Sequence, residues 1–385
     1  MQPDAPSCVL WESLPAEPIA ARIAIAGDFL PSGRLAIPPG SSWKEMAASV
    51  APLFRDVDAG IANLEAVLDA GGLAPRSLNG LGDIVSAPRA ALDYLAALRL
   101  QILGVANNHS FDFGATGLSR TLGAISARGM ARLGAGRTLR DSPDIFAWHH
   151  PSANLRVGFW AAAKATHDPS TTCFHGVEPA TLSRGLQALK TLRNQGAQFC
   201  IALLHAGCLR ANFPDPEDVR LEDSLAAAGF DIVAASHSHR ISGARLVSSS
   251  TRSSFCFYGL GSLVSGYISS PLEAEGLIVV ASLTTLGALA RLEVRPVWLA
   301  PSGWAESPTP EIAHHILTRF ESLSRQIADG SFAARFYRDM SKGMFGVYWR
   351  DARAAFRESG ILGLVHKAGR MRLRHIKRLV RAVVG

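Results

Sequence analysis

Short apolar runs that end in polar clusters recur along the chain. They are ARIAIAGD ending at Asp28, AGIANLE at Glu65, QILGVANNH at His109, FCIALLHAG just after His205, and DIVAASHSH at His239. Runs that are apolar throughout and rich in β-branched residues are typical of strands buried on both faces. Amphipathic stretches between them predict helices over 89–98, 116–128, 179–195 and 216–228. This alternation predicts an α/β protein whose sheet is covered by helices.

The later part of the chain has a different pattern. Residues 255–299 are strand-rich with glycine turns, which fits the second half of a sheet pair. Within them, GLIVVASLTTLGALARL is broken by Ser and Thr and predicts strand, turn and strand, because a membrane span needs about 20 uninterrupted apolar residues. APSGWAESPTP at 300–310 is a break, and helix is expected beyond it. We therefore expect an N-terminal extension over 1–20, an α/β domain over 21–299 and a helical C-terminal region over 300–385.

Composition supports a protein with a large core. The chain has 385 residues, of which 48% are hydrophobic and 18% charged, enough for one large domain or two ordinary ones. Its five cysteines are scattered and show no CxxC spacing, so neither a disulfide framework nor a thiolate zinc site is expected. The first residues carry acids and prolines where a secretory signal needs a basic start and an apolar stretch. We therefore expect a cytoplasmic protein.

The positive charge is concentrated at the C-terminus. The formal net charge is +7, and the stretch after Glu358 contains no acid but seven cations, Lys367, Arg370, Arg372, Arg374, Lys377, Arg378 and Arg381. The rest is therefore nearly neutral, which argues against a nucleic-acid-binding core. On a helix, these cations would lie beside an apolar face. Such a helix would contact an anionic membrane surface, bind a synthase partner or dock on its own domain, and the sequence leaves these choices open.

Side chains able to bind metal stand where the predicted strands end. In sheets of this kind ligands bind beyond the carboxyl ends of the strands, because the connecting loops converge there. The side chains at such ends are Asp28, Glu65, Asn108, His109, His205, His237 and His239. Carboxylate, amide and imidazole without thiolate suit Mn, Fe, Zn or Co ions in a two-metal hydrolase. Taken singly, each residue also fits an ordinary helix cap or a satisfied turn.

Six blocks in order resemble the CapA family of capsule and poly-γ-glutamate synthesis proteins. They are GD at 27–28, ANLE at 62–65, ANNHSFDFG at 106–114, LLH at 203–205, HSH at 237–239 and YGLGSLV at 258–264. The resemblance runs over roughly residues 21–290. It implies a branch of the calcineurin-like metallophosphatases, with a four-layer α/β/β/α sandwich and a two-metal site.

The resemblance also implies a role for each matching residue. Asp28 and His239 would bind the first metal, and Glu65 would bridge the two ions. The second metal would be bound by Asn108, His205 and His237. His109 would be an uncoordinated acid that faces the leaving group. From its position, Asp112 is expected to orient Asn107 or His109, because carboxylates behind a site commonly fix imidazole tautomers.

The chain departs from the family pattern beside the ligands. Leu30 stands where the metallophosphatases have a second histidine, and Ser238 stands where the family has proline. After His205 the chain reads Ala-Gly-Cys-Leu, where the family commonly has Trp-Gly-x-Glu. Two functions stay open. One is a metal-dependent phosphoesterase-like hydrolase of capsule, poly-γ-glutamate or other exopolymer synthesis, acting on a phosphate-bearing or anionic polymer-related substrate. The other is a non-catalytic accessory protein that binds polymer or a synthase partner.

Overall fold

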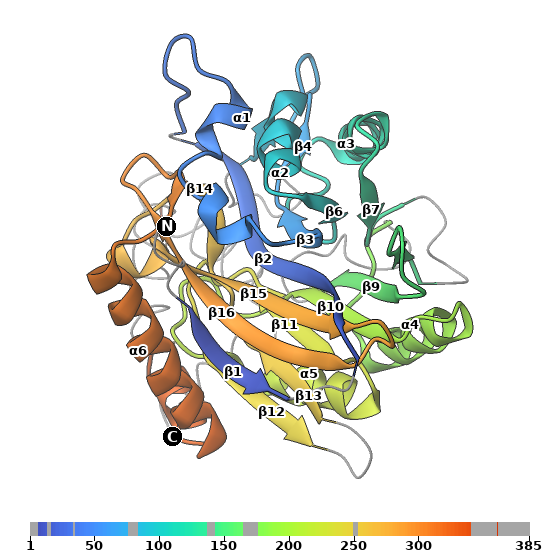
Figure 1. The fold of residues 1–385 in the computed structure, drawn as a ribbon. Coiled ribbons are helices and arrows are strands. Elements are labelled where there is room, and N and C mark those ends of the chain that lie inside the picture. Colours follow the sequence, from blue (N-terminus) through green and yellow to red (C-terminus); the bar gives the residue numbers. More distant parts are fainter. Residues whose placement is uncertain are drawn as a thin grey trace.

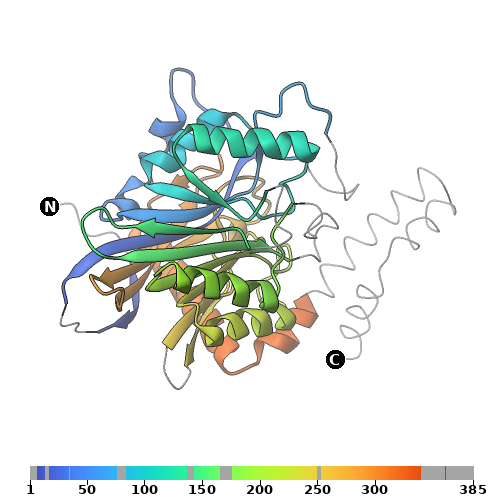
Figure 2. The ribbon, with the colours of Figure 1, turned by 90° about the vertical axis from the view of Figure 1, so that its right-hand side faces the viewer.

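Two sheets lie face to face, with helices on their outer sides. The structure is a computed structural model, and it describes residues 7–13, 17–33, 35–75, 84–136, 143–164, 176–248, 253–339 and 360. Figure 2 shows the four layers from the side: α2 and α3 above, two sheets between, and α4, α5 and α6 below. The predicted four-layer α/β/β/α architecture is confirmed.

The first sheet is nine-stranded and mixed. Its main path runs β1 (Cys8–Glu12), β16 (Leu289–Leu299), β15 (Glu275–Thr284), β2 (Ile19–Gly33), β3 (Ala59–Leu64), β6 (Leu100–Gly104) and β7 (Ala131–Leu133). Two further strands, β14 (Ser262–Gly266) and β17 (Ala305–Glu306), pair with β2 and β16. Strands β2, β3, β6 and β7 are parallel to one another, so their carboxyl ends lie at the same edge of the sheet.

The second sheet is six-stranded with a parallel centre. Its order is β12 (Ala244–Ser248), β13 (Ser253–Phe257), β11 (Ile232–Ser236), β10 (Phe199–His205), β9 (Arg156–Ala163) and β8 (Ile145–His149). Only the edge strands β12 and β8 are antiparallel to their neighbours. A separate two-stranded sheet pairs β4 (Val67–Leu68) with β5 (Ser86–Ala87).

The predicted helices are present, and a short helix over Trp43–Met46 that was not predicted adds to them. Those beside the first sheet are α1 (Trp43–Met46), α2 (Leu92–Ala97) and α3 (Gly114–Ala127), and the others are α4 (Leu182–Asn194), α5 (Pro216–Ala228) and α6 (Pro310–Ala328) (Figure 1). Short 3₁₀ helices cover Ala51–Phe54, Arg89–Ala91 and Pro271–Glu273. Helix α4 begins later than predicted because the side chain of Thr181 accepts a hydrogen bond from the Arg184 N–H and caps it.

Alternation along the strands explains their uniformly apolar sequences. In β2, Ile23 and Ile25 belong to the core cluster that includes residues of both sheets. Ala24 and Ala26, on the opposite face, belong to the cluster that contains residues of α2 and α3. Because side chains alternate along a strand, one apolar run serves two cores. The prediction of strands buried on both faces is confirmed.

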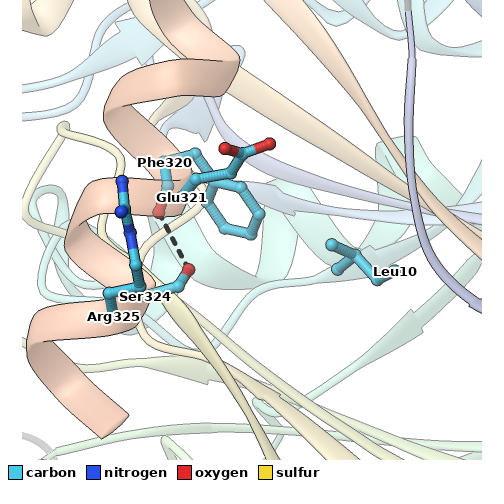
Figure 3. A pocket seen from close by; sticks show the side chains of 5 residues that line it. All are labelled: Leu10, Phe320, Glu321, Ser324 and Arg325. Atoms are coloured by element: carbon cyan, nitrogen blue, oxygen red, sulfur yellow. Dashed lines mark hydrogen bonds between the residues drawn. The ribbon is translucent and has the colours of Figure 1, made fainter. Parts of the chain in front are cut away.

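The C-terminal part of the described chain packs on both sheets. As predicted, residues 275–299 form strand, turn and strand, and α6 contacts β12 and β16. Next to β1, α6 borders a hollow of about 430 Å³ lined by Leu10, Phe320, Glu321, Ser324 and Arg325 (Figure 3). No helix among the described residues is long and apolar enough to cross a membrane. The predicted basic helix around 367–381 lies outside the described residues.

One predicted strand end is wrong. Asp28 was expected to follow its strand, but β2 continues to Gly33. The cause is β14, which pairs in parallel with β2 from Asp28 onward and extends its ladder. On the side of β3 the register shifts between Ile25 and Asp28, and such an irregularity redirects a side chain. Asp28 therefore lies within a strand, at the point where its pairing partners change.

Candidate metal centre

The structure brings the predicted ligands to one place. Glu65 follows β3 directly, Asn108 follows β6, and His205 ends β10. The turn after β11 carries His237 and His239. Both sheets therefore contribute to the site. Each residue reaches it because the parallel strands of one sheet end at a common edge.

Asp28 is fully buried and holds three elements together. Its Oδ1 accepts a hydrogen bond from Asn63 Nδ2 at 2.7 Å, and its Oδ2 accepts one from the backbone N–H of His237 at 3.0 Å. The same Oδ2 lies 3.1 Å from Nδ1 of His239. The neighbouring Gly27 admits no side chain, because a Cβ there would lie 2.1 Å from the carbonyl oxygen of Gly261. This packing fixes the Asp28 carboxylate at the floor of the site.

Glu65 occupies the centre, and its carboxylate lacks hydrogen bonds. The side chain is 1% exposed, and neither oxygen accepts a hydrogen bond from any described residue. Nitrogens of three histidines lie within 4.0 Å of this carboxylate. Oε1 lies 3.4 Å from His205 Nε2 and 3.9 Å from His109 Nε2, and Oε2 lies 4.0 Å from His239 Nδ1. A buried carboxylate without hydrogen bonds is costly, so a counter-charge is expected between these groups.

Two atoms with lone pairs lie close to Nε2 of His205. Its Nε2 lies 2.6 Å from Asn108 Oδ1 and 2.9 Å from His237 Nδ1. Its Nδ1 lies 3.1 Å from Asn63 Nδ2, which fixes the other edge of the ring. A single imidazole nitrogen cannot satisfy this many acceptors with one proton. A bound cation would satisfy them together.

The turn that carries the two histidines is strained. His237 has φ of 115° and His239 has φ of 54°, both in the region that favours glycine. Ser238 supports the turn, since its hydroxyl donates to the carbonyl of Arg240 and accepts from the N–H of Arg240. This serine replaces the proline of the family pattern and supplies the turn by hydrogen bonding. Such strain is maintained by surrounding contacts and is commonest at functional sites.

His109 lies at the opening of the site with a fixed ring. Its side chain is 15% exposed, and Nδ1 lies 2.7 Å from Asp112 Oδ2. Because the same Oδ2 accepts the N–H of Val85 at 2.7 Å, Asp112 is itself held in place. Nε2 of His109 therefore points toward Glu65. The predicted contact between Asp112 and His109 is present, and Asp112 makes no recorded contact with Asn107.

Sequence reasoning assigned no role to Asn63, which links both halves of the site. It donates to Asp28, lies against His205 and accepts a hydrogen bond from Asn107 Nδ2 at 3.1 Å. Asn107 also donates to the carbonyl of Leu64 at 2.8 Å and so fixes the end of β6 beside β3. A buried amide inside the apolar run ANLE was the available signal, because a core strand rarely carries an unpaired amide.

The charges of this centre are strongly coupled. Burial opposes the charged form of Asp28, but hydrogen bonds and attraction from His205 and His239 hold its pKa well below the usual value. Burial likewise opposes a charged His205, but Glu65 and Asp28 raise its pKa to about 9. The same two carboxylates raise the pKa of His239 against the effect of burial. In the metal-free protein, the raised pKa of His205 therefore favours a protonated imidazole beside the carboxylates of Glu65 and Asp28.

Two overlapping groups have the spacing of metal ligands. Ligand atoms of Glu65, His205 and His237 lie within 4.8 Å of one another, and so do those of Asp28, Glu65 and His239. Glu65 is common to both groups, as a bridging ligand must be. The oxygen and nitrogen donors suit divalent Mn, Fe, Zn or Co. The residues therefore fit a divalent metal centre.

Metal affinity is expected to rise with pH. A divalent ion must displace the proton of His205, whose folded pKa of about 9 exceeds its ordinary value. Because the pKa of His205 is raised in the folded protein, its proton stabilises the metal-free fold fully below about pH 6.5. This stabilisation is lost as the pH rises through about 9. Titration calorimetry with Mn²⁺ between about pH 6.5 and 8.5 should give about a tenfold stronger affinity per pH unit. A pH-independent affinity would show that His205 is not a ligand.

Comparisons with known proteins agree with the resemblance predicted from the six blocks. The family described as bacterial capsule synthesis protein PGA_cap matches residues 22–267. The capsule biosynthesis protein CapA of Bacillus anthracis is 25% identical over 168 residues, which are 42% of this chain and 39% of that protein. The chain therefore aligns with less than half of this relative.

Solved structures give weaker likenesses. The calcineurin-like phosphoesterase YfkN of Bacillus subtilis has 11% identity, with a TM-score of 0.45 over 80% of this chain and 99% of that one. The NAD nucleotidase NadN of Haemophilus influenzae has 12% identity, with a TM-score of 0.44 over 78% of this chain and 56% of that one. The relationship of this chain to known proteins therefore rests on the family match over residues 22–267.

Proposed function

From its membership of the bacterial capsule synthesis protein family PGA_cap, to which this chain belongs, we propose that the protein is a metal-dependent, phosphoesterase-like hydrolase of capsule or poly-γ-glutamate synthesis. The observation that supports this most is Glu65, whose buried carboxylate lacks hydrogen bonds and lies between two groups of ligand atoms. A protein that needed only a stable fold would gain by replacing this carboxylate with an apolar residue.

The ligand assignment follows the two groups. Asp28 and His239 would hold one divalent ion, His205, His237 and Asn108 would hold the other, and Glu65 would contribute to both. When bound, a pair of divalent ions supplies positive charge that stabilises the phosphoryl group during its transfer. The protein contributes the fixed geometry, because Asn63 and the turn at 237–239 position these side chains before substrate arrives.

His109 is proposed as the proton donor to the leaving oxygen. Asp112 accepts the proton on Nδ1, so the tautomer and the ring orientation are set and Nε2 is directed into the site. In the protonated imidazole Nε2 carries the proton that a departing alkoxide requires. Partial exposure of the ring leaves room for a substrate to approach it.

The proposed substrate carries a phosphate ester or an acyl phosphate and belongs to the synthesis of an anionic polymer. The test is hydrolysis of p-nitrophenyl phosphate, bis(p-nitrophenyl) phosphate and acetyl phosphate by protein loaded with Mn²⁺. Turnover that is abolished by EDTA and restored by Mn²⁺ supports the proposal. A matched control is His314→Ala, since this histidine is exposed on α6 and lies outside the two ligand groups.

A non-catalytic accessory protein is the second candidate. One observation favours it: Leu30 stands where the metallophosphatases have a second histidine, so the group formed by Asp28, Glu65 and His239 gains no imidazole from that position. A protein that binds metal but hydrolyses none of the three esters would fit this reading. Metal content and turnover measured on one preparation separate the two functions.

A further inference from the structure

An arginine beside the metal-binding turn pairs with a buried glutamate and has a half-exposed side chain. Arg210 lies in the loop that follows His205, and its backbone N–H donates to the carbonyl of Ser238 at 2.9 Å. Ser238 stands between the two histidines of the metal-binding turn. Arg210 is therefore fixed on that turn by its backbone, although it is not among the predicted ligands.

The backbone of Arg210 is strained. Its φ of 60° is uncommon for a residue with a side chain, and strain of this kind persists only where other contacts impose it. The side chain is 49% exposed, and Nε lies 3.2 Å from Oε1 of Glu273, a residue whose side chain is 4% exposed. No described residue is recorded as a partner of its Nη1 or Nη2. The guanidinium is thus paired with a buried carboxylate through Nε, while about half of the side chain remains exposed.

Neighbouring side chains make this loop rigid. Arg240, the residue after His239, donates to Asn212 Oδ1 at 3.1 Å and lies 3.5 Å from Glu273. Arg319 of α6 donates to the same Asn212 oxygen at 3.3 Å and pairs with Glu275. Helix α6, which lies outside the matched region 22–267, therefore holds the loop that carries Arg210.

The network has little net charge of its own. Three arginines face Glu273 and Glu275, and Asp339 accepts a hydrogen bond from Asn212 Nδ2 at 3.2 Å. Any anion bound here would therefore be recognised by the free N–H groups of Arg210 and not by a broad positive field. A guanidinium suits carboxylate and phosphate, because its planar donors match their oxygens.

We propose that Arg210 binds an anionic group of the substrate, a carboxylate or a phosphate, beside the metal-binding turn at 237–239. The inference rests on the proposed function, since it assigns Arg210 to the substrate of that centre. It makes Arg210 a specificity-determining residue for an acidic polymer chain. The exposed Leu209 beside it, 52% accessible, leaves the loop open to a long ligand.

The test measures binding directly, by calorimetric titration of the full-length protein in its metal-loaded and metal-free forms. The probes are an oligoglutamate, a phosphoserine peptide of equal length and an uncharged oligoglutamine. Arg210→Ala should weaken binding of at least one anionic probe by about tenfold or more, the effect of one charged hydrogen bond, with Arg210→Lys intermediate. Arg220→Ala, an exposed arginine on α5, is the control and should change affinity less than about twofold.

The pattern of losses distinguishes the source of the anion. A loss confined to oligoglutamate assigns a carboxylate, and a loss confined to the phosphopeptide assigns a phosphate. Unchanged affinity in Arg210→Ala, equal losses in Arg220→Ala, or no binding of either anionic probe to the wild-type protein would overturn the proposal. Since binding is measured without turnover, absence of hydrolysis alone would count against the proposed function and not against this inference.

Discussion

Replacing Glu65 by glutamine is expected to remove both metal ions. The substitution keeps the shape of the side chain but removes the charge shared by the two ligand groups. Removing one partner of a buried charge interaction costs about 3 to 5 kcal/mol, so Mn²⁺ affinity should fall by at least about 100-fold. Turnover should fall with it. Metal analysis by mass spectrometry after desalting measures the effect.

The control for this variant is Glu217→Gln, which removes an exposed carboxylate from α5. It should retain the metal content of the wild-type protein. Circular dichroism should show both variants folded, because the exchange in Glu65→Gln adds no volume. A Glu65→Gln protein that keeps two ions per chain would contradict the bridging role.

His109→Ala is expected to keep the metals and lose most of the turnover. A positioned general acid contributes about 10² to 10⁴ in rate, and His109 is positioned by Asp112 at 2.7 Å. Esters with poor leaving groups should be affected more than p-nitrophenyl phosphate, because an oxygen that leaves readily needs less protonation.

The variant Asp112→Asn tests the contact between Asp112 and His109. Asp112 is a positioning residue, so its loss should lower turnover less than the loss of His109 and leave metal content unchanged. His314→Ala again serves as the control. Full turnover in His109→Ala at every pH would show that another group donates the proton.

Much of this site could be predicted because its residues are tied to the ends of strands. Glu65, His205 and His237 follow apolar runs directly, and parallel strands carry their ends to one edge. The sequence blocks then distinguished Asn108 from Asn107. In the structure Asn108 lies against His205, and Asn107 lies against the backbone of Leu64. Their ligand roles stay predictions until metal is measured.

Other features depend on partners distant in the sequence. The continuation of β2 past Asp28 is caused by β14, which lies more than 200 residues later and is not visible in the local pattern. Asn63 looked like one polar residue within a strand, and its role follows only from the approach of β10 in the other sheet. Arg210 lies in a loop whose backbone is fixed by the turn at 237–239. No periodicity along the chain encodes these contacts.

The most direct test of the metal centre is anomalous diffraction from crystals grown with Mn²⁺, recorded near the manganese absorption edge. Two anomalous peaks are expected, roughly 3.5 to 4 Å apart, as in two-metal sites. Glu65 should lie between them, with Asp28 and His239 at one peak and His205, His237 and Asn108 at the other. Absence of any peak at Glu65 in crystals that contain Mn²⁺ would contradict the account.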